Sequence, residues 1–140
     1  AEDDHDGMKM FTNAYGDRIQ IIGDDYLVTN AQKITNSASQ GICNAALIKV
    51  NQAGTVSEAL NALEAAKKAG WGTIISARSG ETEDVTLTHL AVGFDAGQLK
   101  VGSFSRSERM AKWNEGLRIA EQMGTAVNYI GRNALSGKIG

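Results

Sequence analysis

The sequence predicts an α/β fold in which parallel strands alternate with helices, forming about half of a TIM-like (β/α)8 barrel. Four short apolar segments begin at residues 18, 45, 72 and 98, so that their starts are 27, 27 and 26 residues apart. Helix-like stretches lie between them, and this alternation is typical of a parallel sheet with right-handed crossovers. Polar residues gather where these segments end, as they do at the functional face of βα barrels.

The length and composition are those of one globular domain. The chain has 140 residues, 42% hydrophobic and 21% charged, with a net charge of −2. This profile excludes a disordered chain and offers no basic stripe for nucleic acid. A complete barrel needs roughly 250 residues, so the chain has room for about half of one. We expect four βα units within residues 1–124, preceded by an entry helix at about 4–14, and a loosely packed tail over 125–140.

The first elements are weakly marked. Met8, Phe11 and Tyr15 indicate the entry helix by their spacing. The strand RIQII at 18–22 is bounded by Asp and Gly, which are common at strand ends. A helix is expected over 29–40.

The middle of the chain carries the strongest helix signal. After the strand AALIKV at 45–50, Thr55 and Glu58 form a Thr-x-x-Glu capping box. The helix that follows has apolar residues at helical spacing and is expected to end at Gly70. The strand GTIISA at 72–77 comes next.

The last unit repeats the pattern. A weaker helix is expected over 82–92, before the strand QLKVG at 98–102. Ser105 and Glu108 form a second capping box, which predicts a helix that Ser105 caps and Gly124 ends.

Cysteine usage and the start of the chain indicate a reducing compartment. The single cysteine, Cys43, cannot form an internal disulfide and is expected to be a small buried side chain. The opening AEDDHDG is acidic, unlike a signal peptide, and no apolar run approaches the roughly 18 residues of a membrane span. We expect a cytoplasmic protein with no nucleic-acid or membrane partner. Ala at position 1 and the absence of proline fit a piece of a longer polypeptide.

Two lysines interrupt the apolar strands. Lys49 stands in ALIKV and Lys100 in QLKVG. A lysine inside a buried strand costs free energy unless its charge is paired, so either both reach the rim from edge strands or both take part in chemistry. We favour the second interpretation, because the same face also offers the carboxylate of Asp24. One lysine would then remove a proton, and the other would hold developing negative charge.

Asp24 and the stretch Arg78-Ser79-Gly80 supply the other polar groups. Asp24 is a hard oxygen ligand suited to Mg²⁺, although Gly-Asp-Asp is also common in turns. No second carboxylate ends a later strand, so any further Mg²⁺ ligands are expected outside this chain. Arg78, Ser79 and Gly80 offer a guanidinium, a hydroxyl and amides that suit a phosphate or carboxylate. The expected substrate is a small phosphorylated acid.

These residues lie in stretches that resemble the C-terminal part of the enolase family. The match covers nearly the whole chain and is looser after about Gly124. The resemblance implies the C-terminal half of an enolase-type barrel and the Mg²⁺-dependent dehydration of 2-phosphoglycerate to phosphoenolpyruvate in glycolysis. The matching stretches are AEDD at 1–4, QIIGDDYLVTN at 20–30, ALIKVNQAGTVSEAL at 46–60, AGWGTIISARSGETED at 69–84 and GQLKVGSFSRSERMAKWN at 97–114.

The resemblance also implies a role for each candidate residue. Asp24 falls on a Mg²⁺ ligand of the family. Lys49 falls on the general base that removes the C2 proton, and Lys100 on a catalytic lysine that contacts the substrate carboxylate. Arg78 and Ser79 fall on the pair that binds the phosphate. A lysine base combined with Mg²⁺ is characteristic of the enolase superfamily.

The chain departs from the family pattern in three respects. Ala77 stands where the family's Ser-His-Arg-Ser-Gly loop has an active-site histidine. The other metal-binding acids, the general-acid glutamate and the N-terminal domain of the family have no counterpart here. Ala53 stands where a larger branched residue is usual. We therefore expect the chain to be inactive by itself.

A second interpretation is a non-catalytic half-barrel that serves as a structural or binding module. A four-stranded half-barrel has two unpaired strand edges, and an open edge invites pairing with another chain. On this interpretation the half-barrel would associate with a second copy of itself, and we expect a homo-oligomer.

Overall fold

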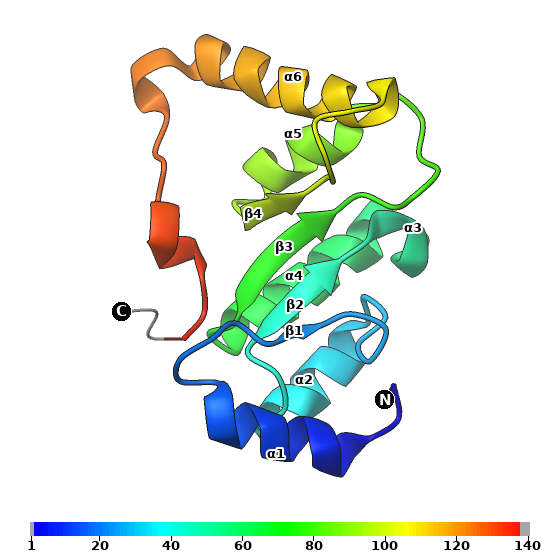
Figure 1. Cartoon of the computed structure of the whole chain (residues 1–140), viewed down its shortest axis with the longest axis vertical. Helices are drawn as coiled ribbons and strands as arrows, with labels where there is room; N and C mark the ends of the chain where they lie inside the picture. The colour runs from blue at the N-terminus through cyan, green and yellow to red at the C-terminus, as the bar shows by residue number, and fades with distance from the viewer. Residues whose placement is uncertain (1, 138–140) are drawn as a thin grey trace.

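A computed structural model describes residues 2–137 and contains one sheet of four parallel strands (Figure 1). Ala45 pairs with Gly72 and Ser76 pairs with Lys100, so consecutive strands are neighbours in the sheet. The predicted α/β fold with four parallel strands is confirmed. In spatial order, the strands are β1 (Ile22–Gly23), β2 (Ala45–Ile48), β3 (Gly72–Ser76) and β4 (Gly97–Lys100).

Three helices cover one face of the sheet, and the others lie at its margins (Figure 1). The covering helices are α2 (Ala31–Ser39), α4 (Val56–Lys68) and α5 (Thr86–Gly93). The marginal elements are α1 (His5–Tyr15), the short α3 (Val50–Ala53), α6 (Ser107–Met123), which packs on α5, and the 3-10 turns η1 (Gly124–Ala126) and η2 (Gly131–Ala134). Within residues 2–137, no helix is long and apolar enough to cross a membrane.

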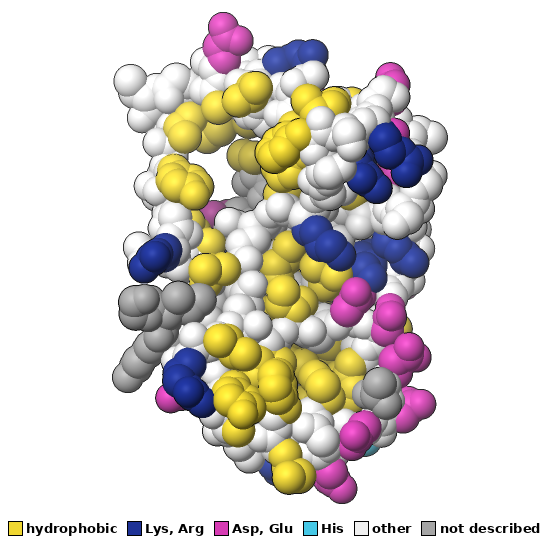
Figure 2. Space-filling view, in the orientation of Figure 1, with side chains coloured by type: hydrophobic (Ala, Val, Ile, Leu, Met, Phe, Trp, Pro, Cys, Tyr) yellow, Lys and Arg dark blue, Asp and Glu magenta, His cyan; other side chains and the backbone are white. Residues whose placement is uncertain are grey.

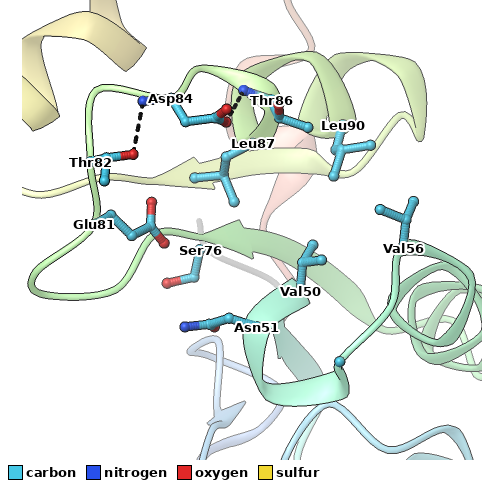
Figure 3. Close-up of a pocket in the computed structure, with 11 residues that line it drawn as sticks. Val50, Asn51, Val56, Ser76, Glu81, Thr82, Asp84, Thr86, Leu87 and Leu90 are labelled. Carbon is cyan, nitrogen blue, oxygen red and sulfur yellow. Dashed lines mark hydrogen bonds between the residues drawn. The ribbon is translucent and has the colours of Figure 1, made fainter.

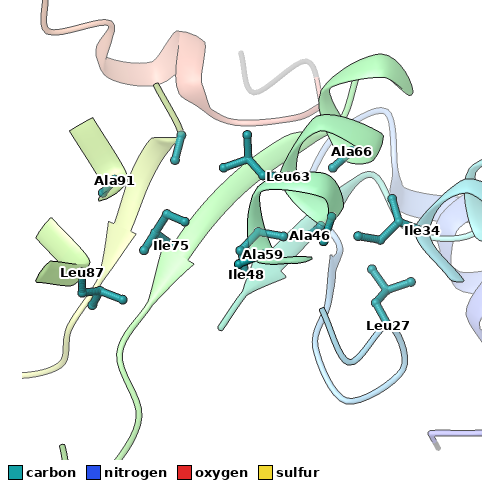
Figure 4. Packing of buried hydrophobic residues seen from close by; sticks show 12 residues of the cluster. Leu27, Ile34, Ala46, Ile48, Ala59, Leu63, Ala66, Ile75, Leu87 and Ala91 are labelled. Carbon is teal, nitrogen blue, oxygen red and sulfur yellow. The ribbon is translucent and has the colours of Figure 1, made fainter. Parts of the chain in front are cut away.

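The main core lies between the sheet and these helices (Figure 4). Alternate residues of the strands, Ala46 and Ile48 in β2 and Ile75 in β3, point toward the helices and are fully buried. α4 contributes alanines and Leu63 at helical spacing, and the small alanine side chains allow the helix to lie close to the sheet. Burial of this apolar surface is the main source of stability for such a layer.

The opposite face of the sheet is less completely covered. Ala45, Leu47 and Ile74 form a small buried cluster there, while Ile22 at the β1 edge is 41% exposed. Apolar side chains are visible over the strands in the space-filling view (Figure 2). In a complete barrel, this face would be the interior.

The two predicted capping boxes have different outcomes. Thr55 caps α4 as expected, because its Oγ1 accepts the backbone N–H of Glu58 at 3.1 Å. The prediction for Ser105 is wrong: Arg106, at φ +77°, precedes α6 instead. The Ser105 hydroxyl is bonded to that of Ser103 at 2.9 Å, and the Glu108 carboxylate pairs with the Arg106 side chain at 2.9 Å.

All four strands are shorter than expected, and at the ends of β1 and β2 a side chain takes a backbone donor. The Ile21 N–H donates to Asn44 Oδ1 at 2.6 Å, and β1 begins only at Ile22. The Lys49 N–H donates to Thr29 Oγ1 at 3.0 Å, so β2 ends at Ile48 and the one-turn helix α3 follows. The sequence prediction missed that turn.

Neutral polar groups interlock at the amino end of the sheet. The side-chain amides of Gln20 and Gln98 exchange two hydrogen bonds of 2.9 Å. Ser136 joins them, because its N–H donates to Gln20 Oε1 at 3.1 Å and its Oγ accepts the Gly72 N–H at 2.7 Å. A Cβ on Gly72 would lie 2.6 Å from Ser136 Oγ, so any other residue would displace this hydroxyl. We call Gln20, Gly72, Gln98 and Ser136 the amino-end cluster.

The C-terminal segment therefore reaches across the sheet to its amino end. Residues 125–137 are mostly exposed, yet the Ala134 carbonyl also accepts a 2.8 Å bond from Gln98 Nε2. The expected tail extends to residue 140, and its last three positions, 138–140, lie outside the described residues.

Cys43 is a free cysteine and is only 3% exposed, as predicted for a small buried side chain. It lies just before β2, close to the amino end of the sheet. Burial raises the pKa of its thiol from the ordinary value of 9.0 to about 11. A thiol with that pKa is a poor nucleophile at neutral pH.

Candidate active site

All five predicted site residues lie at the carboxyl edge of the sheet. Asp24 directly follows β1, and Lys49 directly follows β2. Arg78 and Ser79 come shortly after β3, and Lys100 is the last residue of β4. In Figure 2, basic side chains gather above acidic ones on the right of the view, over the loops that follow the strands.

Strand register places three polar residues in one row across the sheet. Ile48 pairs with Ile75, and Ser76 pairs with Lys100, so Lys49, Ser76 and Lys100 are laterally aligned. Neighbouring strands lie roughly 4.8 Å apart, and the alternation of side chains turns all three away from the main core. Sequence reasoning missed Ser76, which is 1% exposed. The only signal was a small polar residue ending an apolar strand.

Lys49 is a buried, paired cation. It is 6% exposed, and its ammonium group is hydrogen-bonded to the carboxylate of Asp24. Asp25 Oδ1 lies 4.0 Å from the same nitrogen. This pairing offsets the desolvation of the charge, as the sequence argument requires of a strand lysine.

Thr29 fixes the backbone at Lys49. Its Oγ1 accepts the Lys49 N–H at 3.0 Å and donates to Gln52 Oε1 at 2.8 Å. Val28 and Thr29 have φ values of +45° and +52°, a left-handed conformation that costs β-branched residues about 1–2 kcal/mol each. Strain of this kind persists only where surrounding contacts enforce it, and here it places the Thr29 hydroxyl beside Lys49.

Lys100 differs from Lys49 and from expectation. Its side chain is exposed, whereas the sequence argument treated it as buried within a strand. The reason is its position: β4 has one neighbour in the described sheet, and β2 has two. A strand on the far side of β4 would be needed to enclose Lys100.

The loop after β3 presents Arg78 and Ser79 to solvent. The N–H of Ala77 donates to the Lys100 carbonyl at 2.8 Å, which holds the start of the loop beside β4. The Arg78 N–H donates to Glu81 Oε1 at 2.8 Å, and Gly80 turns the chain at φ +84°. Throughout residues 2–137, no hydrogen bond or ion pair joins this loop to the Lys49–Asp24 pair.

A pocket of about 300 Å³ adjoins this edge between α3 and α5 (Figure 3). Val50 and Leu87 form part of its apolar wall, while Ser76 and Glu81 lie at its polar end. At its rim, a hydrogen bond from the Thr86 backbone N–H lowers the pKa of the Asp84 carboxyl. None of the five predicted site residues lines this pocket, which adjoins the predicted site through Ser76 and Glu81.

The residues present do not form a Mg²⁺ site by themselves. No group of three or more His, Cys, Asp and Glu side chains that could hold a metal ion is found in the described part of the chain. Asp24 offers a carboxylate, but that carboxylate is bonded to the Lys49 ammonium. Mg²⁺ usually takes one or two carboxylates together with water and substrate oxygens. Asp24 could therefore be one ligand only, with the others supplied from outside this chain.

Parallel βα units with polar residues gathered at the carboxyl ends of their strands define part of a βα-barrel protein. Residues 1–138 match the family model described as enolase, C-terminal TIM barrel domain. The chain belongs to this family. The resemblance found in the sequence is thus confirmed at the level of the family.

Proposed function

We propose that this chain supplies the proton-abstracting part of an enolase active site, which dehydrates 2-phosphoglycerate to phosphoenolpyruvate once further strands complete the barrel. The observation that carries the proposal is the buried ammonium of Lys49, paired with Asp24 at the carboxyl edge and in line with Lys100. Buried charges at strand ends are costly and are typical of functional sites.

Each residue has one task in this reaction. In the completed site, Lys49 takes the proton from C2 as the neutral amine, Lys100 contacts the substrate carboxylate, and Arg78 with Ser79 binds the phosphate. The C3 hydroxyl must leave as water, which needs a proton donor that none of these assignments provides. An ammonium engaged with a carboxylate, as Lys49 is with Asp24, cannot accept a proton. We therefore expect the 140-residue chain to be inactive by itself.

A direct test completes the barrel. The chain would be co-expressed with the amino-terminal half of an active family member, and formation of phosphoenolpyruvate from 2-phosphoglycerate and Mg²⁺ would be followed by ultraviolet absorbance. We expect turnover only from the combination. Lys49→Met should lower it by about 10²–10⁴-fold, the usual contribution of a general base.

The matched control is Lys33→Met, an exposed lysine on α2, which should leave turnover unchanged. Turnover that survives Lys49→Met would contradict the assigned base. Turnover by the chain alone would contradict the need for further strands.

A second candidate is a non-catalytic, self-associating half-barrel. It is favoured by Ala77 in the loop after β3 and by the apolar Ile22, 41% exposed on the open face of the sheet. Two such chains could pair through their β1 and β4 edges with two-fold symmetry. Sedimentation would decide, because a folded monomer at micromolar concentration is incompatible with this function.

A further inference from the structure

A second buried lysine, Lys112, lies beneath the loop that carries Arg78 and Ser79. It is on α6 and is 1% exposed, although a lysine on a helix normally reaches water. The residues lining the small cavity under this loop include Arg78, Ser79, Glu81 and Lys112. None of the roles assigned to the active site uses Lys112.

Every donor of the Lys112 ammonium has an acceptor within the protein. Nζ donates to the Thr82 carbonyl at 2.9 Å and to the Glu108 carbonyl at 3.0 Å, and Glu81 Oε2 lies at 3.3 Å. An ammonium has three N–H donors, so none is left for a ligand. Lys112 therefore cannot bind an anion directly without giving up one of these partners.

Glu81 carries the effect of Lys112 to the exposed part of the loop. One carboxylate oxygen faces the Lys112 ammonium, while the other accepts the Arg78 N–H at 2.8 Å. Apart from the bond that Asp84 accepts from the Thr86 N–H at the start of α5, the contacts of Lys112 with Glu81 and Thr82 are the only hydrogen bonds or ion pairs, among the described residues, that tie residues 78–84 to another element. Thr88 Oγ1 donates to the Lys112 carbonyl at 3.2 Å, which joins α5 to the same point of α6.

We propose that Lys112 is a positioning residue: through Glu81 it fixes the loop 78–84 so that Arg78 and Ser79 are ordered before an oxyanion such as phosphate arrives. The inference rests on the proposed function, which assigns the phosphate to Arg78 and Ser79. Its physical basis is preorganisation, because a loop that is already ordered loses less conformational entropy when it binds.

The test measures loop order and anion binding separately in the whole chain. Lys112→Met keeps the side-chain length and removes the charge, and Lys68→Met, at the exposed end of α4, is the matched control. Amide hydrogen exchange reports order at residues 78–84. Backbone amide shifts at residues 78–80 during titration with inorganic phosphate report affinity.

In Lys112→Met, we expect exchange at residues 78–84 to be faster and phosphate to bind more weakly, each by about tenfold, the usual effect of losing a hydrogen bond to a charged group. In the same variant, amide exchange in β3 should be as slow as in the wild type. The control Lys68→Met should match the wild type in both measurements. If Lys112→Met does not fold, Glu81→Gln carries the test, since Glu81 is on the surface loop and its replacement should change both readouts in the same direction.

Unchanged loop exchange would overturn the inference, and so would faster exchange with unchanged phosphate affinity. The proposed function fails in a different way. If the wild type shows no phosphate-dependent shifts while loop exchange still responds to Lys112→Met, the phosphate assignment is wrong and Lys112 is a loop clamp with no role in binding.

Discussion

The two ends of the sheet are held together by different chemistry. At the carboxyl end, Lys49 and Asp24 form an ion pair, and Arg78 and Lys100 are exposed cations. At the amino end, the amino-end cluster consists of amides, a hydroxyl and a glycine, joined by short neutral hydrogen bonds. The buried lysine and its ion pair therefore lie where chemistry is proposed, and the neutral amino-end cluster lies where the strands begin.

This difference is the one expected if the carboxyl end carries the functional groups and the amino end serves stability. In βα barrels, catalytic residues come from the carboxyl ends of strands, while the opposite face serves stability. Hydrogen bonds between neutral groups need no counter-charge, and salt weakens them little. They are therefore well suited to an end of the sheet that has only a structural role. The carboxyl end accepts strain at Val28 and Thr29 in order to position Lys49.

The largest effect is expected at the charged end. Asp24→Asn removes the negative charge beside Lys49, which is only 6% exposed and would keep an unpaired charge. We expect the free energy of unfolding to fall by about 2 kcal/mol, less than for a fully buried pair because the Asp24 side chain is 40% exposed. Urea unfolding followed by circular dichroism measures the change.

Asp25→Asn is the matched control, because Asp25 is 59% exposed and 4.0 Å from the same ammonium. Its effect should be below about 0.5 kcal/mol. Equal losses in the two variants would mean that Asp24 is not the specific partner of Lys49.

A smaller loss is expected at the neutral end. Gln98→Leu removes the amide that bonds Gln20 and the Ala134 carbonyl, so that Gln20 Nε2 and the Ala134 carbonyl, both partly buried, lose their partner, while Gln20 Oε1 keeps the Ser136 N–H. We expect the free energy of unfolding to fall by about 1–2 kcal/mol, and by the same amount at low and high salt, since no charge is involved. Urea unfolding at two ionic strengths tests this.

The control for Gln98→Leu is Gln32→Leu on the surface of α2, where the amide bonds only Asn36 within its own helix. It should change stability by less than about 0.5 kcal/mol. A loss in Gln98→Leu that depends strongly on salt would contradict the neutral character of the amino end.

The last effect is absent at neutral pH and appears only when a raised pH places a charge on the Cys43 thiol, near the neutral end. Because burial raises the pKa of Cys43 to about 11, the folded state favours the neutral thiol. The resulting stability is fully present below pH 9 and is lost as the pH rises toward 11. The stability advantage of wild type over Cys43→Ser should therefore shrink over this window. An unchanged difference in urea unfolding at pH 7, 9 and 11 would refute it.

The fold was predictable where the signal is local. The apolar strands and the Thr55 capping box are each encoded by a few consecutive residues, and both are confirmed. The capping box predicted at Ser105 does not form, because Ser103 bonds the Ser105 hydroxyl and Arg106 pairs with the Glu108 carboxylate. These competing partners are also local in the sequence. The turn of α3 was missed because Thr29, twenty residues upstream, takes the Lys49 N–H.

The site was predictable in position and less so in environment. Strand ends place Asp24, Lys49 and Lys100 at one edge, since parallel strands share a direction. The exposure of Lys100 depends on what lies beyond β4, which a single sequence does not encode locally. Lys112 resembles any surface helix lysine in the sequence, because its partner Thr82 is 30 residues away.

The amino-end cluster has a consequence for the order of folding. Its hydrogen bonds join residues 78 and 116 positions apart along the chain, so large loops must close before they can form. Contacts that require such loops form late, after local helices and neighbouring strands have assembled. In Gln98→Leu, most of the lost stability should therefore appear as faster unfolding and little as slower folding, which stopped-flow kinetics would show. The amino end would then be the last part of the sheet to assemble, and its hydrogen bonds would slow the unfolding of the assembled chain.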